Sequence, residues 1–315
     1  QYSPDEVFTL IGTQYLEIYH QRKESWLKGK AKKEVKKTYE DIDLLIDNIL
    51  NEYITKNEIL LEQKYRTLYA VHKARINDTF RTVGEIKGTR TKYELDNGEF
   101  KKTILFIHGS TGLGKSTFAK DLSKAIIQLA KLNGQNWQSV VTAATNIFDE
   151  VNGEEILFLD DVRGDSLTAS DWLKLLDPFN ISPISARYQN RMGAAKVIII
   201  TSSKYPLDFF YNTKGNDRED LSQYVRRIEC LAKIRGNDKN PKFYVSYPQR
   251  MEEPVKTILE NEQEVSLSYD FANDSLLNSK QDLLSTLLSK IAINNQWDIL
   301  ELDKSKTPSE TLASE

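Results

Sequence analysis

The sequence predicts an α/β protein with a doubly wound parallel sheet, preceded by a bundle of helices. After residue 102, short and nearly continuous apolar runs alternate with longer amphipathic stretches. Strands buried on both faces and joined by helices produce this alternation. Before that point, apolar residues recur at helical spacing only. We therefore expect a helical segment at 1–80, an α/β domain at 81–250 and an extension at 251–315.

The first segment begins with a helix start signal. Ser3 offers an N-cap, Pro4 suits the first turn, and Asp5 and Glu6 favour the positive end of the helix dipole. Apolar residues then follow helical spacing over 7–19, 39–50 and 59–72. Three amphipathic helices without a strand predict a small bundle or an oligomerisation collar. The glycines and turn residues of 82–102 predict a linker.

The second segment contains four apolar runs with strand character, at 103–107, 139–142, 156–159 and 197–200. A helix is expected at 115–131. Because crossover connections between parallel strands are right-handed, helices should cover both faces of the sheet.

The third segment holds 13 acidic and five basic side chains, so its net charge is −8 and the rest of the chain carries +5. One amphipathic stretch runs from Leu283 to Ile291, and the polar end from Lys304 to Glu315 predicts disorder. An acidic tail behind a basic body is compatible with polyanion binding by the body.

Composition excludes several classes of protein. No apolar stretch approaches the ~20 residues that cross a bilayer, and no charged-then-apolar leader opens the chain. Cys230 is the single cysteine, which excludes a disulfide framework and predicts a buried core residue in a reducing, cytoplasmic compartment. The three histidines have no metal-ligand spacing.

The strongest motif lies between the first expected strand and its helix. It matches G-x-x-x-x-G-K-[ST] and is called the phosphate loop below. Its residues are Gly109, Ser110, Thr111, Gly112, Leu113, Gly114, Lys115, Ser116 and Thr117. Glycines let successive N–H groups surround an anion, and the helix that follows adds its positive dipole end. Lys115 would neutralise the β- and γ-phosphates of ATP, and Ser116 would ligate Mg²⁺.

A pair of carboxylates follows the apolar run 156–159. Asp160 would hold the Mg²⁺ shell, and Asp161 would polarise the attacking water. The alternative for Asp161 is a cap on the next element. At the end of the run 197–200, Ser202 would contact the γ-phosphate or the water, although polar strand ends are also common.

Two basic groups complete the candidate site. Arg226 and Arg227 precede another apolar segment, and an arginine that reaches a neighbouring subunit's γ-phosphate raises the rate by roughly 10³–10⁵. Residues 182–196 read as an exposed hairpin. Its cations would contact nucleic-acid phosphates and its aromatic ring would stack on a base, unless the segment is only a polar surface loop. These residues are Arg187, Tyr188, Arg191 and Lys196.

This order of motifs resembles superfamily 3 helicases. It is most similar to the helicase domain of the replication initiator (Rep) proteins of rolling-circle plasmids and circular single-stranded DNA viruses. The resemblance spans roughly 97–230. Its segments are Asn97-Gly98-Glu99-Phe100, Leu176-Asp177-Pro178, Ala186-Arg187-Tyr188-Gln189-Asn190-Arg191, Ile199-Ile200-Thr201-Ser202 and Arg226-Arg227-Ile228.

The resemblance implies an AAA+-like P-loop ATPase core in a hexameric ring, with ATP and Mg²⁺ held between subunits. Arg226 or Arg227 would act on the neighbour's site, and the hairpin would move along single-stranded DNA in the channel. Assembly would use the N-terminal helices. Many family members have Asn where this chain has Ser202 and Ser203, which weakens the sensor assignment.

Rep proteins usually carry a nicking domain with a two-histidine metal motif, and this chain has no His-x-His. Endonuclease activity is therefore not expected here, and an upstream nicking domain or host replication proteins would be partners. The first hypothesis is an ATP-dependent DNA helicase in rolling-circle replication initiation. The alternative is a ring-forming ATPase that remodels or loads a protein partner. A small-molecule phosphotransferase is disfavoured, because no arginine-rich lid follows the sheet.

Overall fold

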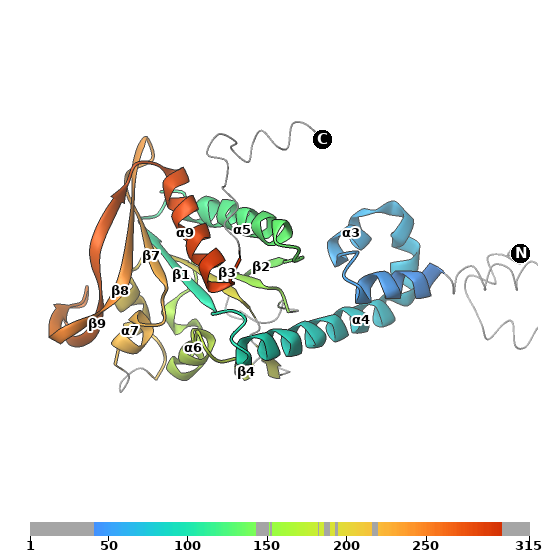
Figure 1. The fold of residues 1–315 in the computed structure, drawn as a ribbon, viewed down its shortest axis with the longest axis horizontal. Coiled ribbons are helices and arrows are strands. Elements are labelled where there is room, and N and C mark those ends of the chain that lie inside the picture. The colour runs from blue at the N-terminus through green and yellow to red at the C-terminus, as the bar shows by residue number, and fades with distance from the viewer. Residues whose placement is uncertain are drawn as a thin grey trace, which may run out of the picture. The chain divides into compact units, whose positions relative to one another are not determined.

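The computed structural model describes residues 41–142, 151, 153–181, 183–185, 190–192, 195–215 and 220–297, with the backbone alone at 183–185 and 190–192 (Figure 1). The chain divides into two compact units between Val83 and Gly84, close to the boundary expected at residue 80. Within the described ranges, no helix combines the length and apolar character that a membrane span requires.

The N-terminal unit is helical. Residues 41–50 form a helix, α3 covers Lys56–Leu61, and α4 covers Gln63–Asp96 with non-helical torsion angles at His72. Thr55 starts α3 with a capping box, because its backbone N–H donates to the Glu58 carboxylate at 2.7 Å. The apolar stripe packs into one core that includes Ile42, Leu45, Ile49, Ile59 and Ile76. The helices expected before residue 41 lie outside the described residues.

The linker expected at 82–102 is wrong, because α4 stays helical to Asp96. One of its glycines, Gly84, lies in close contact with Gly153. A Cβ on Gly153 would lie 2.9 Å from the Gly84 carbonyl oxygen. The buried Lys87–Glu155 ion pair, at 3.0 Å, fastens the same stretch of helix to the start of β3. Tertiary contacts thus override the low helix propensity of glycine.

The second unit is built on a seven-stranded, mostly parallel sheet. Its spatial order is β2-β3-β6-β1-β7-β8-β9, and the first five strands run parallel. The bounds are β1 Thr103–Gly109, β2 Ser139–Thr142, β3 Ile156–Leu159, β6 Val197–Ser202, β7 Cys230–Asn237, β8 Asn240–Ile258 and β9 Glu264–Leu277. The carboxyl ends of the parallel strands share one edge of the sheet, called the carboxyl edge; the opposite edge is the amino edge.

Helices cover both faces of this sheet, which confirms the doubly wound fold. On one face, Leu105 and Ile107 of β1 pack with α5 (Lys115–Leu132) and α9 (Lys280–Asn294). On the other, Ile104 and Phe106 share a core with the shorter helices. These are η1 Gly164–Ser166, α6 Ala169–Leu175, α7 Pro206–Tyr211 and α8 Ser222–Val225. Cys230 is buried as predicted, and burial raises the pKa of its thiol to about 12.

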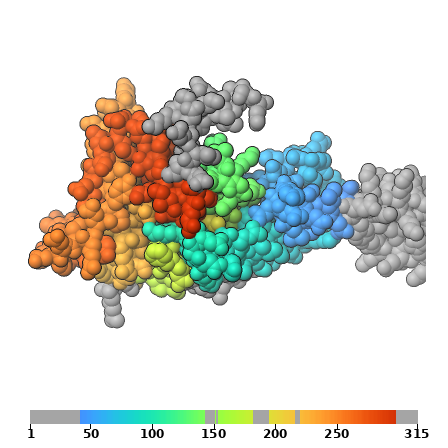
Figure 2. All heavy atoms as spheres, in the orientation of Figure 1, coloured from blue at the N-terminus to red at the C-terminus, as the bar shows by residue number. Residues whose placement is uncertain are grey.

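The C-terminal part of the chain differs from the expected acidic extension. The strand β8 crosses residue 250, and α9 packs beside α5, where Lys280 pairs with Asp121 at 2.7 Å (Figure 2). The carbonyl of Asn294 also accepts a hydrogen bond from the Lys101 N–H at 2.7 Å. Residues 251–297 are therefore part of the α/β unit. The polar end expected at 304–315 lies outside the described residues.

Candidate active site

The phosphate loop joins β1 to α5 at the carboxyl edge of the sheet, and glycine is required there for two reasons. Gly112 and Gly114 have φ of +87° and +77°, a conformation that side chains with a Cβ rarely adopt. Gly109 allows close approach instead, since a Cβ there would lie 2.5 Å from the Ile234 carbonyl oxygen on β7. The predicted turn between strand and helix is therefore present.

Lys115 opens α5 and folds back over the loop. Its side chain is buried, and its Nζ donates to the Ser110 carbonyl at 3.1 Å. Gly114, the N-cap residue, has no side chain to cap the helix, so the first N–H groups of α5 keep their capacity to bind an anion. The Lys115 side chain and the N-terminus of α5 thus lie at the same small region of the loop, which suits the binding of a phosphate chain.

Asp160, at the end of β3, lies against the start of α5. Its Oδ1 accepts a hydrogen bond from Ser116 Oγ at 2.5 Å and another from Thr201 Oγ1 at 2.9 Å. A hydroxyl and a carboxylate are oxygen ligands of the kind that Mg²⁺ takes in nucleotide sites. The residues therefore fit a magnesium ion, with Ser116 and Asp160 as its protein ligands.

Asp161 has an unusual backbone, with φ of +49°. Its N–H donates to Thr201 Oγ1 at 2.9 Å, which holds this conformation, and its side chain is exposed. The capping alternative finds no support in the described elements that follow, because Arg163 is the N-cap of η1 and Thr168 is the N-cap of α6. The role of the exposed Asp161 carboxylate in orienting a water stays a prediction.

Thr201 is the site residue that the sequence reasoning missed. Side chains alternate along β6, so Thr201 shares the α5 face with Val197 and Ile199. Ser202 points to the opposite face, where it is buried and its Oγ accepts from the Lys204 N–H at 3.1 Å. Ser202 therefore does not share the face of Ser116 and Asp160, and its predicted contact with the γ-phosphate stays a prediction; strand alternation is the signal that identifies Thr201.

A second polar cluster lies beside the loop, on the face away from α5. His108 pairs in register with Lys233 of β7, and burial, together with the charges of Lys233, Arg235 and Lys115, lowers the pKa of His108. Lys233 is itself buried, with its Nζ 2.6 Å from Asp274 of β9. The imidazole is therefore uncharged at neutral pH, and Asp274 compensates the buried ammonium.

The hairpin is present in the backbone. The strands β4 (Pro183–Ser185) and β5 (Asn190–Met192) pair antiparallel. Arg187 and Tyr188 lie outside the described residues, and the side chain of Arg191 does too.

Lys196 does not fit the predicted contact with nucleic acid. Its side chain is only 9% exposed, its Nζ lies 2.6 Å from Glu94, and it packs over the Phe100 ring. An ammonium that is buried and already paired with a carboxylate is not available to a phosphate.

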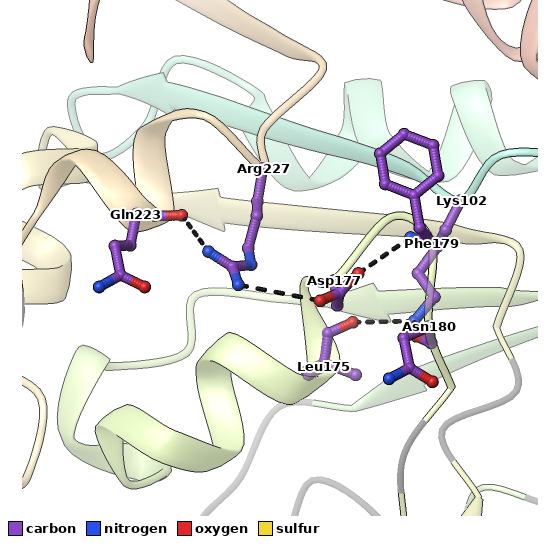
Figure 3. A network of polar contacts seen from close by, with 7 residues as sticks. All are labelled: Lys102, Leu175, Asp177, Phe179, Asn180, Gln223 and Arg227. Atoms are coloured by element: carbon purple, nitrogen blue, oxygen red, sulfur yellow. Dashed lines mark hydrogen bonds and ion pairs between the residues drawn. The ribbon is translucent and has the colours of Figure 1, made fainter. Parts of the chain in front are cut away.

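Arg226 and Arg227 lie just before β7, at the amino edge of the sheet, opposite the chain's own phosphate loop. Arg226 is exposed. Arg227 is turned inward (Figure 3): its Nη1 donates to the Gln223 carbonyl at 2.8 Å, and its Nη2 lies 3.8 Å from Asp177 Oδ2. Only Arg226 is therefore in a position to reach another molecule, and Arg227 does not fit the finger role.

Comparison with known proteins identifies similar domains. A sequence model of the RNA helicase family matches residues 105–204, which include most of β1, the phosphate loop, Asp160 and β6. The "Replication protein" of Onion yellows phytoplasma (strain OY-M) is 36% identical over 131 residues, or 41% of this chain and 32% of that protein. The "Genome polyprotein" of Human klassevirus 1 is 23% identical over 140 residues, or 43% of this chain and 6% of the polyprotein.

These matches confirm the resemblance to a superfamily 3 helicase domain of the Rep type. The chain spans about a third of the length of the phytoplasma protein and a much smaller share of the polyprotein.

Proposed function

We propose that this chain is an ATP-dependent helicase or translocase that acts on single-stranded DNA during replication initiation of a rolling-circle replicon. The observation that carries the proposal is the convergence of Ser116, Asp160 and Thr201 at the phosphate loop. The phytoplasma relative, named a replication protein, supports the process, and the RNA helicase match supports the class of motor.

Each residue of the site has a role in ATP hydrolysis. Lys115 neutralises charge on the β- and γ-phosphates, and the N–H groups at the start of α5 hold the phosphate oxygens. Ser116 and Asp160 hold Mg²⁺, which when bound offsets the charge that develops on the phosphates. Asp161 orients the attacking water and accepts its proton, while Thr201 fixes both aspartates.

Assembly and movement make up the second half of the proposal. The chain forms a ring, hexameric by the resemblance, in which Arg226 of one subunit stabilises the transition state at its neighbour's phosphate loop. The exposed position of Arg226 at the amino edge supports this role. Arg187 and Arg191 of the hairpin contact DNA phosphates, and Tyr188 stacks on a base.

The test is the ATP turnover of the purified chain with and without single-stranded oligonucleotides. We expect stimulation by DNA, and the double variant Arg187→Ala, Arg191→Ala should lose DNA affinity while basal turnover stays. Arg250→Ala, an exposed arginine on β8, is the matched control and should retain affinity.

Parallel reactions with RNA of the same sequence decide which polynucleotide the motor prefers. If neither DNA nor RNA alters turnover and the hairpin variant binds DNA as well as the wild type, the helicase proposal fails. A ring-forming ATPase that remodels a protein partner would then account better for the site.

A further inference from the structure

We propose that Arg227 and Lys102, which both hold the turn 175–180 around Asp177, couple the β4–β5 hairpin to Arg226, so that nucleic acid on the hairpin accelerates ATP hydrolysis. This inference rests on the proposed function, since it takes the hairpin as the DNA contact and Arg226 as the residue that serves a neighbouring site. Asp177, Arg227 and Lys102 are positioning residues in this account.

The centre of the coupling is the turn 175–180, which connects α6 to the hairpin (Figure 3). Asp177 organises it, because its Oδ1 accepts a hydrogen bond from the Phe179 N–H at 3.0 Å. The strand β4 begins at Pro183, three residues beyond Asn180. Ile181 is buried in a cluster with Leu95 and Phe100. The turn and Ile181, which lead towards the hairpin, are therefore packed against the rest of the α/β unit.

Lys102 supports this turn by hydrogen bonds to its carbonyl groups. The residue is only 1% exposed, and its Nζ donates to the carbonyls of Leu175 at 3.1 Å and Asn180 at 3.2 Å. Its backbone N–H donates to the Pro178 carbonyl at 3.1 Å. Burial lowers the pKa of this lysine to about 8. Lys102 directly precedes β1, the strand that leads to the phosphate loop. Lys102 therefore links the turn 175–180 to that strand.

Arg227 holds the turn from the other side. Its side chain is 14% exposed, and its guanidinium lies 2.8 Å from the Gln223 carbonyl of α8 and 3.8 Å from the Asp177 carboxylate. Arg226 is the preceding residue and caps the end of α8, so the two arginines share one backbone turn. A displacement of the Asp177 side chain is thus transmitted through Arg227 to the backbone of the adjacent Arg226.

A coupling network and a purely structural network differ in the effect that breaking the Asp177–Arg227 contact should have on ATP turnover. Removing the charge of Asp177 breaks the link to Arg227, whereas the Phe179 N–H still has an oxygen to accept its hydrogen bond in Asp177→Asn. The fold of the turn is thus kept while the link is cut. The phosphate loop and the hairpin arginines, which act directly on ATP and DNA, are untouched.

The experiment uses the full chain and three readouts: basal ATP turnover, affinity for a single-stranded DNA oligonucleotide by fluorescence anisotropy, and turnover at saturating DNA. In Asp177→Asn we expect the first two to stay near wild type and the stimulation by DNA to fall about fivefold or more. Asp177→Glu, which keeps the charge, should retain most of the stimulation. Asp165→Asn, an exposed carboxylate in η1, is the matched control and should behave as wild type.

The outcomes separate the inference from the function on which it rests. Unchanged stimulation in Asp177→Asn would overturn the coupling and leave the helicase proposal standing. A parallel loss of basal turnover, DNA affinity and melting temperature would also overturn it, because Asp177 would then be structural only. Wild-type turnover that does not respond to DNA would remove the proposed function itself, and the coupling with it.

Discussion

Asp160 shows how single residues set up the site. One of its carboxylate oxygens accepts hydrogen bonds from two hydroxyls, those of Ser116 and Thr201, and Thr201 also accepts from the Asp161 N–H. A short β-branched side chain thus fixes the rotamer of one aspartate and the left-handed backbone of the other. Thr201 is therefore a positioning residue for both carboxylates.

We predict that Thr201→Val lowers the turnover number for ATP by about tenfold or more, because a hydrogen bond to a charged group is worth roughly 1.5–3 kcal/mol. The valine is nearly isosteric, so the strand should keep its packing. Ser202→Ala, on the other face of β6, is the control and should change turnover little. A lower turnover number in Ser202→Ala than in Thr201→Val, measured by steady-state kinetics, would contradict the assignment of Thr201 as the positioning residue.

The sequence predicted the positions of those residues that follow from local patterns. The phosphate loop and Asp160 belong to this class, because a strand, a turn and a helix place them without distant partners. Lys196 does not, since its ion pair is with Glu94, about a hundred residues earlier in the chain. Its burial arises from tertiary packing, which leaves no signal in the surrounding sequence.

At the scale of elements, the parallel strands and α5 were predictable because their apolar runs are continuous. The strands β8 and β9 were not. The second half of β8 is mostly polar and exposed, so it carries no strand alternation. In β9 the alternation is present, since Val265, Leu267, Tyr269 and Phe271 pack on or against the core, but the acidic composition of the segment pointed to an extension instead. The sequence predicted a linker at 82–102 because of its glycines, whereas α4 continues through them to Asp96.

The ion pair between Lys233 of β7 and Asp274 of β9 leads to a prediction about the free energy of unfolding. Burial raises the pKa of the Asp274 carboxyl, but hydrogen bonds from Lys233 and Ser246 outweigh this and lower it overall. The pair therefore stabilises the fold at neutral pH, and this contribution is lost as the pH falls below the unfolded-state value of 3.8 towards the lowered pKa. Asp274→Ala should destabilise the protein by about 1–3 kcal/mol, because the buried Lys233 ammonium loses its charged hydrogen-bond partner.

Glu264→Gln is the matched control on the same strand. It breaks the exposed Lys256–Glu264 pair, in which both side chains are more than half exposed, and should cost less than about 1 kcal/mol. Thermal or urea unfolding followed by circular dichroism measures both variants at pH 7. Equal losses of stability would show that the Lys233–Asp274 pair does not support the sheet.

At the scale of the whole molecule, the account requires sites shared between subunits. The two units divide inside the helix α4, between Val83 and Gly84, so the change from helical periodicity to alternating strands and helices marks the start of the sheet and not the division itself. Assembly could not be derived in this way, since contacts between subunits depend on exposed side chains that carry no periodic signal. Arg226 is the residue through which assembly is tested.

We predict that Arg226→Ala reduces ATP turnover by a factor on the order of 10³–10⁵. Lys115→Ala should also be inactive, because its loop cannot hold the phosphates. Mixing the two variants should restore activity, since Lys115→Ala subunits supply Arg226 to the intact loops of their neighbours. Turnover measured across mixing ratios checks this, and a flat, inactive series in which mixed oligomers form would exclude a shared site.

Isothermal titration calorimetry with ATP and Mg²⁺ tests most directly whether the loop between β1 and α5 is a triphosphate site. The wild-type chain should show saturable binding, and Lys115→Ala should show at least a large loss of affinity at unchanged folding. Equal affinity in the two proteins, or no heat of binding in the wild type at any nucleotide concentration, would contradict the account.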